Sequence, residues 1–231
     1  MIGPFLVSFS RDSSNPFRNY AIPEDGAAPS DDEVRALINA YRDRGLAPRL
    51  EYIADLAPAV EPALLRAGFF AEGRLALMDF PHAAGSERAA PSGFELIAPS
   101  TDVELLSMRI VQHEAYGEPE APGPSEVEAL RRALEAGGGA VLAQTTPGAV
   151  PAGAGEYSPP CDGVTEITGV GVRAEYRRRG LAAAMTVWLI RRALEHDIPN
   201  VFLMANEGEE RIYAREGFVT RGQVLHIRTH P

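Results

Sequence analysis

The stretch Val170-Gly-Val-Arg-Ala-Glu-Tyr-Arg-Arg-Arg-Gly-Leu-Ala182 joins an apolar strand to a basic, glycine-containing turn that opens a helix. The first four N–H groups of a helix have no partner within it, and the helix macrodipole adds about half a positive charge at that end. Gly180 allows a ligand to approach the backbone, and residues 177–179 supply three arginine charges that do not titrate. The turn is therefore a candidate binding site for a phosphate or diphosphate group.

The turn also carries a family resemblance. Arg177, Gly180 and Ala182, placed after a Val-x-Val strand, resemble motif A of the GNAT acyl-CoA N-acyltransferases. The resemblance extends over roughly residues 93–231. It implies a mixed-sheet, three-layer fold in which two neighbouring parallel strands, residues 167–172 and 201–204, splay apart to form a V-shaped cleft.

A second motif follows at the spacing usual in this family. Ala205 and Asn206 are followed by Tyr213, seven residues after Asn206, and then by Gly217-Phe218. The resemblance implies that main-chain groups of the strand end pair with the pantetheine arm of coenzyme A, and that the turn binds its diphosphate. The residues so implied as cofactor-binding are Val170, Gly171, Val172, Arg177, Arg178, Arg179, Gly180, Leu181, Ala182, Ala183 and Asn206.

Transfer of an acyl group from a thioester to an amine needs a base for the amine and an acid for the leaving thiolate. Tyr213 matches the family tyrosine near the thioester sulfur and is the candidate acid. Glu166, eleven residues before Arg177, is the candidate base, with a water chain or His113 as alternatives. Strand alternation predicts that Glu166, Thr168, Val170 and Val172 share one face. Asn206 could also be a helix N-cap.

The C-terminal part reads as a strand at 94–98, two helices, three strands, a helix at 181–196, a strand at 201–204, a short helix at 207–216 and final strands at 219–227. The helices are expected to open with capping boxes at Thr101-Asp-Val-Glu104 and Ser125-Glu-Val-Glu128. This order predicts an α+β unit rather than a regular doubly wound sheet.

The N-terminal part reads as a degenerate repeat. Arg66-Ala-Gly-Phe69 and Arg215-Glu-Gly-Phe218 each end a short helix, and a glycine follows each phenylalanine by four residues. Residues 23–33, which match the arginine turn, hold five carboxylates, and Leu64 stands in place of Tyr213. We therefore expect residues 1–80 to be a GNAT-like half-domain without a cofactor site, residues 81–93 a linker and residues 94–231 the catalytic domain.

Composition excludes several other classes of site. All 22 basic residues are arginines, which excludes Schiff-base chemistry on a lysine of this chain and a P-loop lysine. The net charge of −10 disfavours nucleic acid as a partner. Cys161 is the single cysteine, so no intramolecular disulfide or cysteine-based zinc site can form. A cytoplasmic protein without membrane span, signal peptide or metal is expected.

The sequence thus predicts an N-acetyltransferase that moves an acetyl group from acetyl-CoA directly to a primary amine of a small molecule or peptide. A sensor that binds acyl-CoA without catalysis is the main alternative, and an interaction scaffold with an incidental motif is a second one. Oligomeric state is open between monomer and homodimer.

Overall fold

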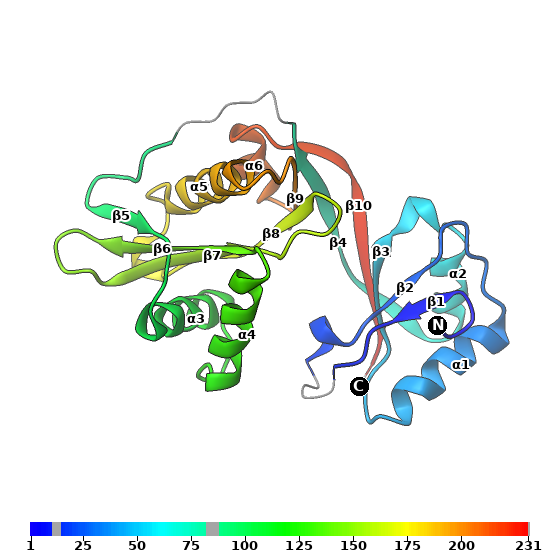
Figure 1. The fold of residues 1–231 in the computed structure, drawn as a ribbon. Coiled ribbons are helices and arrows are strands. Elements are labelled where there is room, and N and C mark those ends of the chain that lie inside the picture. The colour runs from blue at the N-terminus through cyan, green and yellow to red at the C-terminus, as the bar shows by residue number, and fades with distance from the viewer. Residues whose placement is uncertain (11–14, 82–87, 231) are drawn as a thin grey trace. The chain divides into compact units, whose positions relative to one another are not determined.

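The computed structural model describes residues 1–10, 15–81 and 88–230. The chain forms two compact units (Figure 1). The first contains Met1–Leu77, Met204–Glu207 and Arg221–Pro231, and the second contains Met78–Leu203 and Gly208–Thr220. Of the predicted linker at 81–93, residues 82–87 lie outside the described part of the chain.

The first unit is built on strands in the order β1-β2-β3-β10. Its helix α1 begins at the predicted capping box, in which Ser30 Oγ accepts from the Glu33 N–H and the Glu33 carboxylate accepts from the Ser30 N–H. Leu37, Leu64 and Leu225 lie in its buried core. Its elements are β1 (Phe5–Val7), η1 (Pro16–Arg18), β2 (Ala21–Pro23), α1 (Asp31–Arg42), β3 (Arg49–Ile53), η2 (Ala54–Leu56), α2 (Val60–Arg66), most of β4 (Phe69–Phe80) and most of β10 (Val219–Thr229).

The second unit has three layers: α3 and α4 cover one face of the sheet β9-β8-β7-β6-β5, and α5 covers the other (Figure 1). This arrangement confirms the predicted α+β, mixed-sheet three-layer fold. The elements are β5 (Phe94–Ile97), α3 (Asp102–Tyr116), α4 (Pro124–Glu135), β6 (Gly139–Thr145), β7 (Pro151–Tyr157), β8 (Val164–Val172), η3 (Ala174–Tyr176), α5 (Leu181–Glu195), most of β9 (Asn200–Ala205), α6 (Glu210–Arg215) and the start of β10 (Val219–Thr229).

Helix starts follow local capping chemistry. Thr101 and Glu104 form the predicted reciprocal pair at the start of α3. The predicted box at Ser125 is wrong, because the N-cap of α4 is Gly123, two residues earlier, and the helix begins at Pro124. Proline has no N–H to leave unpaired and suits the first helical position. The Glu126 carboxylate instead accepts from the Gly123 N–H at 3.0 Å.

The two halves of the chain repeat one element order: two strands, a helix, a strand, a short helix and a long strand, from β1 to β4 and again from β7 to β10. The long last strand of the second half, however, completes the first unit. β10 pairs antiparallel with β3 from Val224↔Ile53 to Arg228↔Arg49. Residues 204–207 and 221–230, assigned from sequence to the C-terminal domain, therefore pack in the first unit.

β10 also contributes to a buried ionic cluster beside β3. Arg49, only 2% exposed, donates to Glu51, to Glu72 at 2.7 Å and to His226 Nδ1 at 3.1 Å. Two carboxylates and an imidazole thus compensate a guanidinium removed from water, which a lone buried charge would not tolerate.

The parallel strands β8 and β9 pair only over part of their length. Their register runs from Val164↔Asn200 to Ile167↔Leu203 and ends there, while β8 continues to Val172. Beyond Ile167 the strand stays paired with β7 on its other side. β8 and β9 therefore separate at the predicted place.

Candidate functional site

The arginine turn brings together main-chain N–H groups at the start of α5. Gly180 is the N-cap residue, with φ +82°, and Arg178 also has a left-handed backbone, with φ +61°. The first helical bond joins the Ala184 N–H to the Gly180 carbonyl. In the part of the chain that the structure describes, no backbone hydrogen bond engages the N–H groups of residues 178–183. The turn therefore presents a set of free donors to an anion.

The three arginines of the turn have different environments. Arg177 folds back on the strand, where its Nε donates to the Val172 carbonyl at 3.0 Å. Arg179 donates to the Glu175 carbonyl at 3.3 Å and lies near the rings of Phe94 and Tyr176. Arg178 is exposed, and no hydrogen bond or ion pair to another described residue engages its guanidinium.

A fourth arginine lies beside the turn, and sequence reasoning missed it because it falls in the predicted linker. Arg88 donates through Nε and Nη2 to the carboxylate of Glu216, at 3.0 and 2.6 Å. Glu216 is buried, so this two-pronged pair satisfies its charge. The third nitrogen, Nη1, lies 4.0 Å from the position that a Cβ would take on Gly180.

The end of β8 has one paired edge and one edge free of strand neighbours. The Arg173 N–H donates to the Ala152 carbonyl of β7, so the trans peptide directs the Val172 carbonyl to the opposite edge, where Arg177 binds it. The Val170 carbonyl accepts from the Tyr116 hydroxyl at 3.4 Å. Gly171 allows close packing, because a Cβ there would lie 2.7 Å from Ala115 Cβ.

A one-residue bulge interrupts β8 just before this edge. Ala154 pairs with Gly171 and Glu156 with Thr168, so β8 spans three steps where β7 spans two, and Gly169 has φ +63°. The prediction that Glu166, Thr168, Val170 and Val172 share one face is therefore wrong.

The bulge separates the residues before and after it. Thr168 lies opposite Glu156, whose carboxylate bonds to α3. Val170 is on the α5 side, because a Cβ built on Gly155 would meet both Val170 and Leu189 of α5. Glu166 is half-buried in the paired part of β8, opposite Phe202, and its main chain bonds to Ser158.

Tyr213 lies on α6, half-buried, with its ring edge-to-face against Phe218 at 6.0 Å. Burial raises the pKa of its phenol above the usual value, with further increases from Glu209 and Tyr116. The side chain is therefore protonated at neutral pH, as a proton donor must be.

Tyr116 is a site residue that sequence reasoning missed. Although 58% of it is exposed, desolvation of the phenol, followed by the charges of Glu209 and Glu156, raises its pKa to about 12. Tyr116 also contributes to the raised pKa of Tyr213, and Glu209 raises the pKa of both phenols, so the two side chains share one electrostatic environment. The helical spacing of Arg109, Gln112 and Tyr116 was the available signal, since it places all three on one face of α3.

Two other predicted residues have different surroundings. The His113 Nδ1–H donates to the Glu120 carbonyl at 2.8 Å, and Nε2 lies 2.9 Å from Glu126. Because both ring nitrogens are engaged, His113 does not have the free nitrogen that a base needs. Asn206 is exposed, in the other compact unit, and the N-cap of α6 is Glu209 rather than Asn206.

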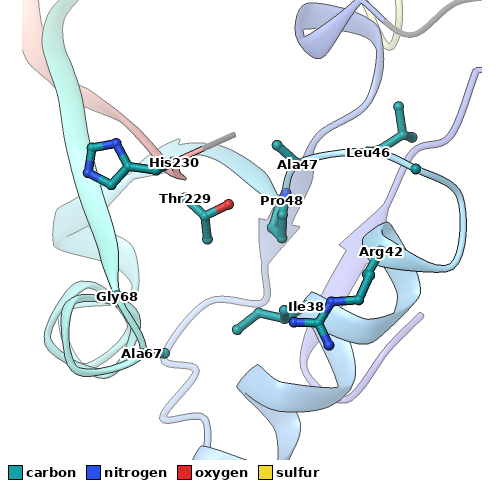
Figure 2. Close-up of a pocket in the computed structure, with 10 residues that line it drawn as sticks. Ile38, Arg42, Leu46, Ala47, Pro48, Ala67, Gly68, Thr229 and His230 are labelled. Atoms are coloured by element: carbon teal, nitrogen blue, oxygen red, sulfur yellow. The ribbon is translucent and has the colours of Figure 1, made fainter.

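A separate cavity of 720 Å³ lies in the first unit, at the ends of α1 and α2 (Figure 2). Arg42 and His230 are its charged or titratable lining residues, and the rest of the lining is small or apolar. None of the predicted site residues lines it. Within the described ranges, no cluster of three or more metal-ligating side chains occurs, and no helix is long and apolar enough to cross a membrane.

Comparison with solved structures shows the fold. A GCN5-related N-acetyltransferase from Kribbella flavida superposes with a TM-score of 0.81 at 23% identity, covering 100% of this chain and 88% of that one. One from Sphaerobacter thermophilus has a TM-score of 0.66 at 18% identity, covering 81% and 63%. A tandem GNAT protein from the clavulanic acid biosynthesis pathway has a TM-score of 0.64 at 14% identity, covering 92% and 76%.

No curated protein matches the sequence. The family comparison does match, over residues 105–218, a range that contains the strand end at Val172, the arginine turn and Tyr213. With the separated strands and the free donors at the start of α5, this match shows that residues 105–218 of the chain belong to the acetyltransferase (GNAT) family.

Proposed function

We propose that this chain is an N-acetyltransferase that moves an acetyl group from acetyl-CoA directly to a primary amine of a small molecule or peptide. The observation that carries the proposal is the continuity of the site within the second unit. The free edge of β8 at residues 170–172 leads directly into the unpaired N–H groups of residues 178–183. An elongated ligand with amide groups at one end and a diphosphate at the other fits this sequence of donors and acceptors.

The residues present fit coenzyme A. Val170 and Val172 offer main-chain groups to the amides of the pantetheine arm, and Gly171 lets α3 approach the strand. The diphosphate takes the N–H groups of Gly180, Leu181, Ala182 and Ala183. A Cβ on Gly180 would meet nothing closer than 4.0 Å, so the way to the backbone is open. Arg178 and Arg179 add charge, and Asn206 stays a proposed contact.

Tyr213 is the proposed acid. The amine nitrogen attacks the thioester carbonyl carbon, the carbon–sulfur bond breaks, and the leaving sulfur takes the hydroxyl proton of Tyr213. The raised pKa keeps that proton in place until sulfur leaves. The nitrogen loses its proton to a base, and the tyrosinate is reprotonated from water.

Glu166 is the proposed base. It precedes Val170 by four strand positions, which is about 13 Å along an extended strand. A water chain is therefore the natural carrier between the amine and the Glu166 carboxylate. The acceptor is proposed to enter beside the connection between α3 and α4. The carboxylate of Glu209, whose charge raises the pKa of Tyr116, suits a cationic amine.

The first unit is proposed as a structural or substrate-shaping half without a cofactor site. Leu64, at the position matching Tyr213, is fully buried in its core and offers no proton donor. We further propose a cytoplasmic protein, monomeric or homodimeric, with neither nucleic acid nor a membrane as partner.

The test combines binding and turnover. Acetyl-CoA at about 100 times its dissociation constant should stabilise the protein by about 2.7 kcal/mol, measured as a rise in melting temperature. A panel of amines is then scored by release of free thiol. Replacement of Tyr213 by Phe should lower kcat by about 10²-fold or more, since it removes the acid. Binding without turnover by any amine would favour a sensor, and absence of binding would reject the proposal.

A further inference from the structure

A buried polar cluster connects the bulge of β8 to helix α3, on the face of the sheet opposite to α5. The Gln112 Nε2–H donates to the Gly169 carbonyl at 3.0 Å, and Gln112 Oε1 accepts from Arg109 at 2.8 Å. Arg109 in turn donates to both oxygens of Glu156, at 2.8 and 3.2 Å. The chain of bonds runs from β7, through α3, to the bulged residue of β8.

The cluster leaves little freedom at the bulge. Gln112 is 5% exposed, and the side chains of Arg109 and Glu156 are each 18% exposed. Because Arg109 donates to Gln112 Oε1, the amide of Gln112 is oriented with its Nε2 toward Gly169. A Cβ on Gly169 would lie 2.3 Å from that nitrogen, so only glycine fits beneath Gln112.

The arrangement does not serve stability alone. The Arg109 Nε–H is buried and has no hydrogen-bond partner among the described residues. An unpaired buried donor costs stability, and an apolar contact between α3 and β8 would avoid that cost. A polar cluster does what an apolar contact cannot, because it fixes one rotation of the Gly169 peptide.

The Gly169 peptide determines the next residue on the strand. Val170 follows directly, and its carbonyl lies on the free edge of β8, 3.4 Å from the hydroxyl of Tyr116. Tyr116 comes from the same face of α3 as Arg109 and Gln112. One face of α3 therefore holds the bulge at Gly169 and also supplies the Tyr116 phenol that bonds to Val170.

We infer that Arg109, Gln112 and Glu156 are positioning residues of the acyl transfer: acting through the Gly169 bulge, they set where the Val170 main chain holds the pantetheine arm, and with it the thioester, relative to Tyr213. This inference rests on the proposed function. Because none of the three touches the reacting atoms in this scheme, their loss should change kcat more than the binding of the cofactor.

The test replaces Gln112 with Met, which has similar length but cannot donate to Gly169. The matched control is Met108→Ala, on the same helix in the apolar core, which lowers stability without touching the cluster. Amide hydrogen exchange over residues 164–173 should accelerate about tenfold or more in Gln112→Met and change much less in the control. The kcat should fall about tenfold or more while the KM for acetyl-CoA changes less than about threefold.

Two results would overturn the inference. One is unchanged exchange at residues 164–173 in Gln112→Met, which would show that Gln112 does not hold the bulge. The other is faster exchange with a kcat equal to that of Met108→Ala, which would leave the cluster a structural role only. If Gln112→Met does not fold, Arg109→Lys, which keeps the charge but not the two-pronged bond, is read by the same criteria.

Failure of the proposed function is recognised separately. It would be seen in the unmodified protein, as absence of thiol release from acetyl-CoA with every amine. Exchange measurements need no turnover, so they decide independently whether Gln112 fixes the bulge. Non-additivity provides a last check: in a Tyr213→Phe background, Gln112→Met should cost less in kcat than in the unmodified protein.

Discussion

Three consecutive arginines precede α5, and their hydrogen bonds indicate different roles for them. Arg177 and Arg179 are bound to main-chain carbonyls, so they shape the turn. Arg178 has a left-handed backbone and extends into solvent, and no described residue binds its guanidinium. A diphosphate at the turn could recruit Arg178 without breaking a bond inside the protein.

Arg178→Gln should therefore weaken binding of coenzyme A and leave stability unchanged. Loss of one charge-assisted hydrogen bond at an exposed site corresponds to about a tenfold higher dissociation constant. Calorimetric titration measures the binding, and urea unfolding measures the stability.

Pantetheine, which lacks the diphosphate, tests where Arg178 acts. It should bind more weakly than coenzyme A, and its dissociation constant should be the same for Arg178→Gln and for the unmodified protein. Arg191→Gln, an exposed position on the same helix, is the matched control and should bind coenzyme A normally. Equal weakening by both variants would point to the general field of the protein instead of a contact at the turn.

The role of a single residue could be predicted where it depends only on neighbours close in sequence. Gly180 could be placed at the start of a helix from its sequence neighbours alone, and the structure has it as the N-cap. Helical spacing places Gln112 and Tyr116 on one face of α3, but it does not identify their partners Gly169 and Val170, which lie on an element distant in sequence. Arg88 gave no local signal, because its partner Glu216 is also distant in sequence. The roles of Tyr213 and Glu166 stay predictions.

The connection between α3 and α4 is held by one histidine. His113 reaches the Glu120 carbonyl and the Glu126 carboxylate, with Glu118 3.4 Å away. Burial alone would lower the pKa of His113, but the Glu120 carbonyl and the carboxylates of Glu126 and Glu118 outweigh it and raise the pKa. These acceptors therefore stabilise the protonated imidazolium form of His113.

His113→Gln should destabilise the protein more at about pH 6 than at about pH 8.5. A histidine with a raised folded-state pKa contributes stability that is fully present below its unfolded value of about 6.5 and is lost as pH rises through the folded value. Urea midpoints of the two proteins at both pH values measure the difference.

Burial is the main cause that lowers the pKa of His226, so the stability contributed by this residue depends on pH in the opposite sense to that of His113. Because it is present in both proteins, its contribution cancels when the variant is compared with the unmodified chain at each pH. A stability difference that grows toward high pH would contradict the proposed arrangement of His113.

Elements were predictable where caps and periodicity agree. Capping pairs at Ser30 and Thr101 correctly marked α1 and α3. At α4 the Ser-x-x-Glu pattern competed with Pro124, and proline at the first helical position decided the start. The bulge at Gly169 could not be predicted from β8, because it depends on pairing with β7 and on contact with Gln112.

At the scale of the whole chain, the two sequence repeats do not form two separate sheets. Strand β3 of the first repeat takes β10 of the second as its neighbour, and Leu225 and Ile227 of β10 lie in the core of the first unit. The repeat was visible in the two Gly-Phe tails, but the partner of each strand was not. Local sequence specifies that a strand forms, whereas its neighbour depends on long-range packing.

Residues 1–80 expressed alone should therefore lack a cooperative unfolding transition. Without β10, β3 loses a strand partner and the core loses two fully buried side chains. Circular dichroism during urea titration measures this. The control appends residues 219–230 to residue 80 through a flexible linker and should restore a cooperative transition. Cooperative unfolding of residues 1–80 alone would show that the first repeat is self-sufficient.

The pairing of β3 with β10 also affects folding during synthesis, because the two strands leave the ribosome at different times. Arg49 and His226, joined in the buried cluster, are 177 residues apart. At about 5–20 residues per second of synthesis, a ribosome needs about 10–35 s to pass from one to the other. During that interval the nascent chain carries β3 with an edge that can pair with a neighbouring chain. Translation speed and chaperone supply therefore bear on the yield of the first unit, although it is encoded first.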